Sequence, residues 1–344
     1  MSEKIIESRT FDEERALYGV RDVTVRNCRF DGPADGESAF KECEHVTVNG
    51  AFMNLRYPFW HDRGLELRDV EMTELCRAAL WYSEGVTIED SRLHGIKALR
   101  ECADVRMRGC DVVSPEFGWS TRGLTMEDCR AESEYFLMRA SDVTLRNVRF
   151  SGKYSFQYVE NLVIERCELD TKDAFWHARH VVVRDSVVRG EYLGWYSEDV
   201  TFVNCRIEGT QPLCYCEGLT LVSCEMVGCD LAFERSHVTA EVTTPVTSVK
   251  NPLAGSRISL PAVGEVIRDI EGATGVVELT GEKDRAARRA PAHGREESRP
   301  AGPLARAGCR VAARAPTTKA GRRRNCLRPA KSLVGWTGFE PATP

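Results

Sequence analysis

The chain has 344 residues, of which 29% are charged, and a formal net charge of −5 at pH 7. No stretch approaches the roughly 18 apolar residues that a membrane-spanning helix needs, and the charged N-terminus lacks the apolar core of a signal peptide. We therefore expect a cytoplasmic protein that does not enter the membrane. The acidic body also argues against nucleic-acid binding, which relies on basic residues.

A 19-residue repeat organises the chain. Apolar residues that open successive units recur every 19 positions from Val86 to Val238. The series extends backwards to Leu65, Val46 and Val23, with spacings of 21, 19 and 23. Short fixed periods are typical of solenoids. This period is too short for a pair of helices and suits one coil of three short strands and three turns.

Each unit alternates like a strand and then turns. When the opening residue is position zero, position two is always apolar and position one is mostly threonine, which indicates a strand. Position four is mostly Asn, Asp or Gly, residues that tolerate a left-handed backbone, so we expect a turn there. The pattern predicts an all-β solenoid, a single-stranded parallel β-helix of about 12 coils.

The repeat also sets the predicted boundaries. The β-helix is expected over residues 23–238, with an N-terminal cap over 1–22. A capping-box pattern at Thr10–Glu13 predicts a short helix in that first cap. Residues 239–280 keep strand-like pieces without the clear repeat, and we interpret them as a C-terminal cap. The protein is expected to be a monomer, or a homodimer that associates through this second cap.

The last segment, 281–344, has a different composition. It holds 12 Arg and 3 Lys against 5 acidic residues, and it shows no periodicity. A basic tail can bind nucleic acid, but this one lacks interleaved aromatic residues. Its final residues, GWTGFEPATP, resemble the ends of mispredicted bacterial reading frames. We interpret the segment as a disordered tail produced by a frameshift or read-through.

Cysteines fill one inward column of the repeat. Six of them share position five, where the other units carry small residues: Cys28, Cys110, Cys129, Cys167, Cys205 and Cys224. Free cysteine packs as a small hydrophobic side chain, so we predict a stacked core ladder. A metal site would need cysteine or histidine ligands that converge at set spacings, and we expect neither a metal nor another cofactor. Unpaired cysteines indicate a reducing cytoplasm.

Charge alternates along another column. Position three is occupied on seven successive units by Arg68, Glu89, Arg108, Glu127, Arg146, Glu165 and Arg184. Opposite charges on neighbouring strands support a sheet, whereas like charges destabilise it. The alternation therefore predicts coils that stack in register.

Five of the six tryptophans share one column of the third strand, beside an inward column of Phe, Leu and small residues. Lys41, Arg100 and Gln157 occupy the same column, and charged residues are seldom fully buried. We therefore favour a partly exposed aromatic groove; the alternative is that the tryptophans fill the core. The candidate ligand-binding residues are Trp60, His61, Trp81, Tyr82, Trp119, Trp176, His177, Trp195 and Tyr196.

The same groove offers only weak catalytic candidates, Glu101, Arg139 and His177. Glycosidases need two carboxyl groups about 5 to 9.5 Å apart. The Glu residues of the column that follows the tryptophans, Glu42, Glu101 and Glu234, lie far apart in coil number. The sequence contains no G-x-S-x-G, P-loop or H-E-x-x-H motif. We predict a non-catalytic binding scaffold for a carbohydrate or protein partner. The alternative is a carbohydrate-active enzyme, similar to polysaccharide lyases or glycoside hydrolases, that uses the same groove.

Several phrases resemble a bacterial family catalogued as domain of unknown function 3737. They are RALYGVRDVTVRNCRFDGPADGESAFKEC, FWHD, LWYSE and SVKNPLAGSRISLPAVGEVIRD, and the resemblance covers roughly residues 3–272. It implies a right-handed parallel β-helix of the pectin-lyase-like kind. It brings no established activity and no catalytic residues. The basic tail does not resemble the family.

Overall fold

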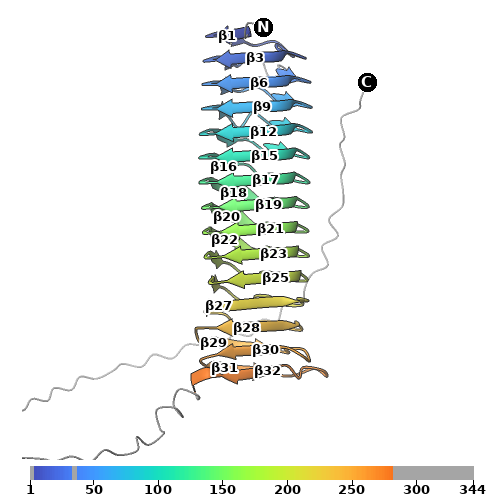
Figure 1. The fold of residues 1–344 in the computed structure, drawn as a ribbon, viewed down its shortest axis with the longest axis vertical. Helices are drawn as coiled ribbons and strands as arrows, with labels where there is room; N and C mark the ends of the chain where they lie inside the picture. Colours follow the sequence, from blue (N-terminus) through green and yellow to red (C-terminus); the bar gives the residue numbers. More distant parts are fainter. Residues whose placement is uncertain (1–3, 33–36, 282–344) are drawn as a thin grey trace, which may run out of the picture. The chain divides into compact units, whose positions relative to one another are not determined.

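The structure is a computed structural model that describes residues 4–32 and 37–281. Within these residues the strands stack in parallel, and about 14 turns of about 19 residues form one β-solenoid (Figure 1). Partner residues in adjacent coils lie 19 positions apart through most of the stack, as in the pairing of Val86 with Val105. The predicted all-β parallel β-helix is therefore confirmed, with slightly more turns than expected. The predicted basic tail lies outside the described residues, except for residue 281.

The first face of the solenoid is a continuous parallel sheet made by the strand that opens each repeat unit. Its strands are β1 (Lys4–Glu7), β3 (Arg21–Arg26), β6 (Glu44–Asn49), β9 (Arg63–Arg68), β12 (Glu84–Glu89), β15 (Ala103–Arg108), β17 (Arg122–Glu127), β19 (Ser141–Arg146), β21 (Glu160–Glu165), β23 (Arg179–Arg184), β25 (Glu198–Val203), β27 (Leu219–Val227), β28 (Val238–Val242), β30 (Arg257–Leu260) and β32 (Val276–Leu279).

The second face follows the turn at position four and consists of shorter strands. They are β2 (Thr10–Phe11), β4 (Arg29–Phe30), β7 (Phe52–Met53), β10 (Glu71–Met72), β13 (Arg92–His94), β16 (Asp111–Val113), β18 (Arg130–Glu134), β20 (Arg149–Lys153), β22 (Glu168–Lys172), β24 (Val187–Arg189) and β26 (Arg206–Glu208). Strand β27 is long enough to continue from the first face into the second, where it pairs with β26.

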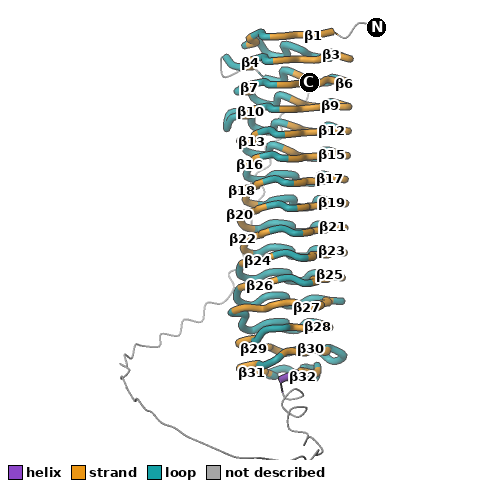
Figure 2. Tube along the Cα trace, turned by 60° about the vertical axis from the view of Figure 1, so that its left-hand side comes forward, coloured by secondary structure: helices purple, strands orange, loops and turns teal. Residues whose placement is uncertain are grey.

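The third face, which carries the tryptophans, changes character along the solenoid. Its first coils pair as a four-stranded sheet of β5 (Phe40–Lys41), β8 (Phe59–Trp60), β11 (Leu80–Trp81) and β14 (Leu99–Arg100). The following coils form turns there instead, drawn as loops between the strands in Figure 2. Near the C-terminal end, β29 (Val246–Lys250) pairs with β31 (Val263–Ile267).

The side chains that point inward form one core along the stack. Phenylalanine rings stack on each other across coils, for example Phe40 on Phe59 and Phe156 on Phe175, with ring centres 5.1 and 4.9 Å apart. Such pairs contribute about 0.5 to 1.5 kcal/mol each beyond the area they bury. All six cysteines of position five are buried, so their predicted packing in the core is confirmed. Within the described ranges no three His, Cys, Asp or Glu side chains gather as metal ligands would.

The charge ladder forms as the alternation predicts. Glu89 pairs in register with Arg68 and Arg108, and the alternation continues in register to Arg184. Arg146 bridges two coils, because its guanidinium nitrogens lie 2.9 Å from a Glu127 oxygen and 3.1 Å from a Glu165 oxygen. The coils therefore stack in register, as the alternation of charge in the sequence predicted.

The N-terminal helix predicted at Thr10–Glu13 is wrong. Strand β1 pairs with β3, and β2 pairs with β4, so residues 4–32 form a coil of the solenoid. The buried Phe11 ring stacks on Phe30 with centres 5.0 Å apart. Sheet pairing and ring stacking on the next coil outweigh the local helix signal, because tertiary contacts override a weak propensity.

The coils also continue past Val238, where the sequence repeat fades. Strand β28 pairs with β27 and β30, and β30 pairs with β32. The apolar opening residue is replaced there by the buried Ser256, whose Oγ accepts a hydrogen bond from the Val238 N–H and donates one to the Ser236 carbonyl. Ser256 fills a core position because backbone groups satisfy its hydroxyl. A search for apolar residues at the repeat spacing therefore misses this coil. No helix in the described part of the chain is long and apolar enough to cross a membrane.

Candidate ligand-binding face

The tryptophan column of the third face is half-buried. Trp60, Trp81, Trp119, Trp176 and Trp195 all have intermediate exposure, whereas the preceding column, which includes Phe40 and Phe175, is fully buried. The column is therefore neither core filler nor a fully exposed platform. We call this column, together with the outer column described below, the aromatic stripe.

The C-terminal tryptophan pair is anchored to the backbone. The Trp176 and Trp195 rings stack with centres 5.5 Å apart and planes 6° apart. The Trp176 indole N–H donates to the carbonyl of Tyr192 at 2.8 Å, and that of Trp195 donates to the carbonyl of Gln211 at 2.9 Å. Trp119 makes the equivalent bond, to the residue 16 positions later. Each of these indoles is thus held against the following coil.

The N-terminal pair has cations on both sides instead. Trp60 and Trp81 stack with centres 5.5 Å apart, while the Lys41 ammonium lies 4.7 Å from the Trp60 ring centre. The Arg100 guanidinium lies 5.2 Å from the Trp81 ring centre and 5.5 Å from that of Trp119. Cations over indole faces are attracted by the ring quadrupole. The indole N–H groups of Trp60 and Trp81 are buried without a hydrogen-bond partner among the described residues.

The next column, which we call the outer column, faces solvent at the corner where each coil leaves the third face. Its residues are Glu42, His61, Tyr82, Glu101, Ser120, Arg139, Tyr158, His177, Tyr196 and Tyr215. Tyr158, His177, Tyr196 and Tyr215 form a continuous stack with centre distances of 4.9, 5.2 and 4.9 Å. Both faces of the His177 and Tyr196 rings are covered by neighbouring rings, so these residues offer their edges to solvent. Burial, and then the charge of Arg179, lowers the pKa of His177.

Every residue of the outer column has a left-handed backbone, with φ between 51° and 61°. At the turn at position four the left-handed residues are mostly Asn, Asp or Gly, for example Asn27, Asp90 and Gly109. Those types adopt this conformation at little cost, whereas other residues are disfavoured there. The outer column contains none of them. The turn alone therefore does not explain which side chains stand at this corner.

The three weak catalytic candidates share the outer column but do not converge. Glu101, Arg139 and His177 follow one another at intervals of two coils, which corresponds to about 10 Å at the usual strand spacing. Glu101 accepts a 3.0 Å bond from Arg100, and the Arg139 guanidinium lies 5.8 Å from the Tyr158 ring centre. Each candidate is thus engaged with a neighbour in the stripe rather than with another candidate.

Sequence reasoning did not select Asp62, the most unusual ionisable group near the stripe. Its side chain is fully buried in the inward column that follows the outer one. The Cys43 N–H donates to its Oδ1 at 2.8 Å, whereas its Oδ2 has no partner among the described residues. Burial raises the pKa of Asp62 to about 8. The available signal was an acidic residue in a column otherwise filled by Cys, Ser, Thr and small apolar residues.

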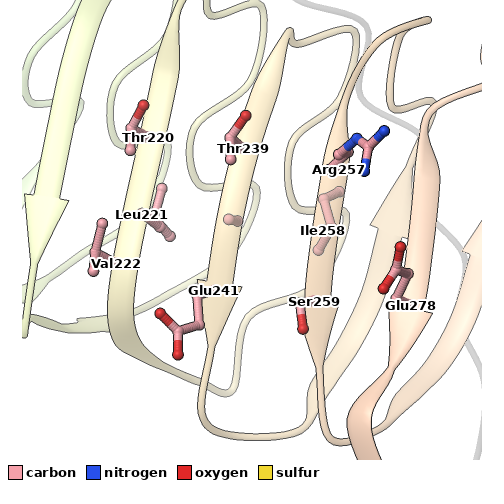
Figure 3. A pocket seen from close by; sticks show the side chains of 10 residues that line it. Thr220, Leu221, Val222, Thr239, Glu241, Arg257, Ile258, Ser259 and Glu278 are labelled. Carbon is pink, nitrogen blue, oxygen red and sulfur yellow. The ribbon is translucent and has the colours of Figure 1, made fainter.

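Two surface hollows lie away from the stripe. One spans β27, β28, β30 and β32, and Figure 3 shows its lining side chains, which include Thr239, Arg257 and Glu241, on the strands of the first face. The other lies near the position-four corner and is lined by residues such as Asp185 and Asn204. Neither hollow contains a residue of the aromatic stripe, so the stripe is a surface separate from both.

Comparisons with solved structures find other proteins at low similarity. The A-module of mannuronan C-5 epimerase AlgE6 from Azotobacter vinelandii is 12% identical with a TM-score of 0.30, covering 76% of this chain and 90% of that one. Tailspike gp49 of Acinetobacter baumannii bacteriophage Fri1, a capsular polysaccharide depolymerase, is 10% identical with a TM-score of 0.36, covering 83% and 66%. These values are too low to transfer an activity.

No curated protein matches the sequence. A family model described as "Protein of unknown function (DUF3737)" matches residues 4–276, in agreement with the resemblance of the sequence phrases. The match spans nearly all of the solenoid that the structure describes. The chain therefore belongs to the DUF3737 family.

Proposed function

We propose that this protein is a non-catalytic binding scaffold whose aromatic stripe holds an oligosaccharide along the coil axis. The carrying observation is the outer column, where bulky aromatic and charged residues occupy left-handed corners. Tyr82, Tyr158 and Tyr196 are 41%, 48% and 44% exposed, so their rings remain accessible to a ligand. Left-handed φ values also occur at buried core residues of the same turns, such as Phe156 and Phe175, so the support comes from left-handed corners that carry exposed rings.

The stacking geometry sets how such a ligand would bind. Inner rings such as Tyr196 have both faces covered, so a sugar would meet ring edges and tyrosine hydroxyls instead of stacking on an open face. Successive stacked rings lie about 5 Å apart, which presents polar groups at a regular interval. A hydroxyl-rich chain that runs along the axis can donate hydrogen bonds to such a row and accept them from it.

A competing explanation is that the rings only stabilise the solenoid. Ring pairs contribute about 0.5 to 1.5 kcal/mol each, which is similar to the roughly 1 to 2 kcal/mol that a left-handed backbone costs most residues. Stability measurements alone therefore do not separate the two explanations. Binding measurements on variants with asparagine at these corners do, because asparagine tolerates the backbone and removes the ring.

The test is a binding screen of the full chain against immobilised oligosaccharides, followed by titration calorimetry on any retained glycan. We expect the double variant Tyr158→Asn and Tyr196→Asn to bind at least tenfold more weakly while its far-UV spectrum stays unchanged. Ser120→Asn is the matched control, since Ser120 occupies the same left-handed column without a ring. Failure to bind any of the immobilised glycans, or equal glycan affinity in the double variant, would rule out the proposal.

The alternative function is a carbohydrate-active enzyme that uses the same face. Glu101 favours it, because its carboxylate lies beside Tyr82, whose pKa is raised first by burial and then by this carboxylate. Arg100 also binds this carboxylate at 3.0 Å. If a turnover screen of polysaccharides reveals an activity, Glu101→Gln should abolish it while leaving glycan affinity intact. An activity that survives Glu101→Gln would place the chemistry elsewhere.

A further inference from the structure

The opposite margin of the third face carries a second aromatic column with a gap in it. On four successive coils this margin presents Tyr135, Tyr154, Asp173 and Tyr192. The Tyr135 and Tyr154 rings stack with centres 4.9 Å apart. Tyr154 and Tyr192 are two coils apart, about 10 Å at the usual strand spacing. An aspartate thus stands where a third ring would continue the stack between Tyr154 and Tyr192.

The carboxylate of Asp173 has no partner in this gap. The residue is 8% exposed, and its side chain makes neither a hydrogen bond nor an ion pair with another described residue; burial raises its pKa, and the charge of Lys172 offsets only part of that rise. Its backbone is held firmly: its N–H donates to the Glu191 carbonyl at 3.0 Å, and its carbonyl accepts from the Gln157 side chain at 3.0 Å. A largely buried carboxylate without a partner is costly, so the site favours a positive charge.

Trp176 supplies a third wall. On the next coil the Tyr192 ring contacts Trp195, three residues later, with centres 5.5 Å apart. Tyr57 and Trp60 make the same contact at 5.7 Å. Asp173 holds the equivalent place, three residues before Trp176, and one face of that indole is stacked on Trp195, so the other face is the one a ligand would contact. The indole N–H of Trp176 is already used by the Tyr192 carbonyl, which fixes the ring there.

We propose that Tyr154, Trp176 and Tyr192 form an aromatic cage, with Asp173 at its base, for a small organic cation of the alkylammonium or guanidinium class. Aromatic faces around a desolvated cation are each favourable, and a carboxylate neutralises its charge. The proposal shares Trp176 with the aromatic stripe but does not rest on the oligosaccharide proposal, because its carboxylate and both tyrosines lie on the other margin of the face and its ligand chemistry is different.

A resident cation already lies near this cage. The Lys172 ammonium is 5.4 Å from the Tyr192 ring centre, and it is bound to Glu191 at 2.8 Å instead of to Asp173. Its side chain is 50% exposed, so it can move outward. A ligand cation would compete with Lys172 for the Tyr192 ring. Lys172→Met should therefore tighten binding several-fold, and loss of binding in this variant would overturn the assignment.

The test is an NMR titration of the full chain with choline, with its neutral isostere 3,3-dimethyl-1-butanol as the matched probe. We expect saturable binding of choline and none of the neutral alcohol. Asp173→Asn preserves the left-handed backbone and the side-chain size, and we expect it to weaken choline binding at least tenfold. Glu116→Gln is the control, since it removes a carboxylate at the same margin three coils earlier, where Glu116 is paired with Lys97.

A second variant keeps the test decisive if Asp173→Asn alters the fold. Tyr192→Asn removes one wall and leaves the carboxylate, and it should also weaken choline binding at least tenfold. Thermal unfolding of each variant verifies that the solenoid is intact. Equal binding of choline and its neutral isostere, or unchanged choline affinity in Asp173→Asn, would overturn the proposal.

Discussion

The two tryptophan pairs occupy the same column and stack at the same 5.5 Å, yet their surroundings differ. Trp60 and Trp81 lie on the paired strands β8 and β11, between Lys41 and Arg100, with unpartnered indole N–H groups. Trp176 and Trp195 lie in the turn region and donate to backbone carbonyls. The repeat therefore determines the position of each tryptophan ring. The local backbone of the third face determines whether the indole N–H finds a hydrogen-bond acceptor.

The largest expected effect concerns Asp62, beneath the N-terminal pair. Its pKa is about 8 in the folded state against an ordinary 3.8, so between these values the folded state holds a proton that the unfolded state has lost. Stability should therefore fall as pH rises from about 4 to about 8 and stay level above that. Asp62→Asn removes this loss and should stabilise the protein by up to about 4 kcal/mol at pH 7.

Denaturant unfolding of both proteins at several pH values measures this difference. The gain should shrink towards zero near pH 4, where Asp62 is protonated in both states. A gain that is independent of pH, or a loss at pH 7, would show that the buried carboxyl is not the cause. The C-terminal pair has no fully buried carboxylate beneath it, because Ala178 and Ser197 occupy the equivalent column.

The second prediction compares the pairs directly. Trp195→Phe leaves the Gln211 carbonyl without its indole donor and should cost about 1 to 2 kcal/mol more than Trp81→Phe, whose indole N–H has no partner to lose. Both changes remove the same volume from half-buried sites. Chemical denaturation of the two variants gives the difference, and equal costs would mean that the hydrogen bond contributes nothing.

A smaller effect is expected at the outer column. Tyr196→Asn removes two stacking contacts and an edge contact with Trp195, and it relieves a left-handed corner; the lost contacts and the relieved strain are similar in size and opposite in sign. We expect the unfolding free energy to change by less than about 1 kcal/mol. Calorimetric melting of this variant beside Ser120→Asn checks it. A loss of several kcal/mol would show that the ring contacts stabilise the fold by much more than the left-handed backbone costs.

The smallest effect is expected in the charge ladder. Arg146→Met removes exposed ion pairs to Glu127 and Glu165, so it should cost under about 1 kcal/mol, and less at high salt. Melting curves at low and high ionic strength measure this dependence. A cost that does not change with salt would point to lost packing of the arginine stem instead of lost charge pairing.

The sequence alone determined the solenoid, its period and the direction of most side chains. A column of opening residues such as Val86 and Val105 can be read directly, because each coil repeats the environment of the last and only apolar residues fit the core. The charge ladder and the cysteine column follow for the same reason. The repeat did not predict the coils at the two ends. There, contacts with the adjacent coil place Thr10 in a strand and allow Ser256 to lie in the core.

Only the tertiary structure decided the exposure and engagement of the third face. Alternation along the chain does not specify side-chain direction where the backbone bends into left-handed turns, so the half-buried state of Trp176 was not readable from the sequence. The unpartnered carboxylates of Asp62 and Asp173 were likewise invisible, because a missing partner depends on residues one or two coils away. A periodic sequence specifies which residues of adjacent coils stack on each other, whereas the backbone geometry at the corners determines which side chains remain available to bind a ligand.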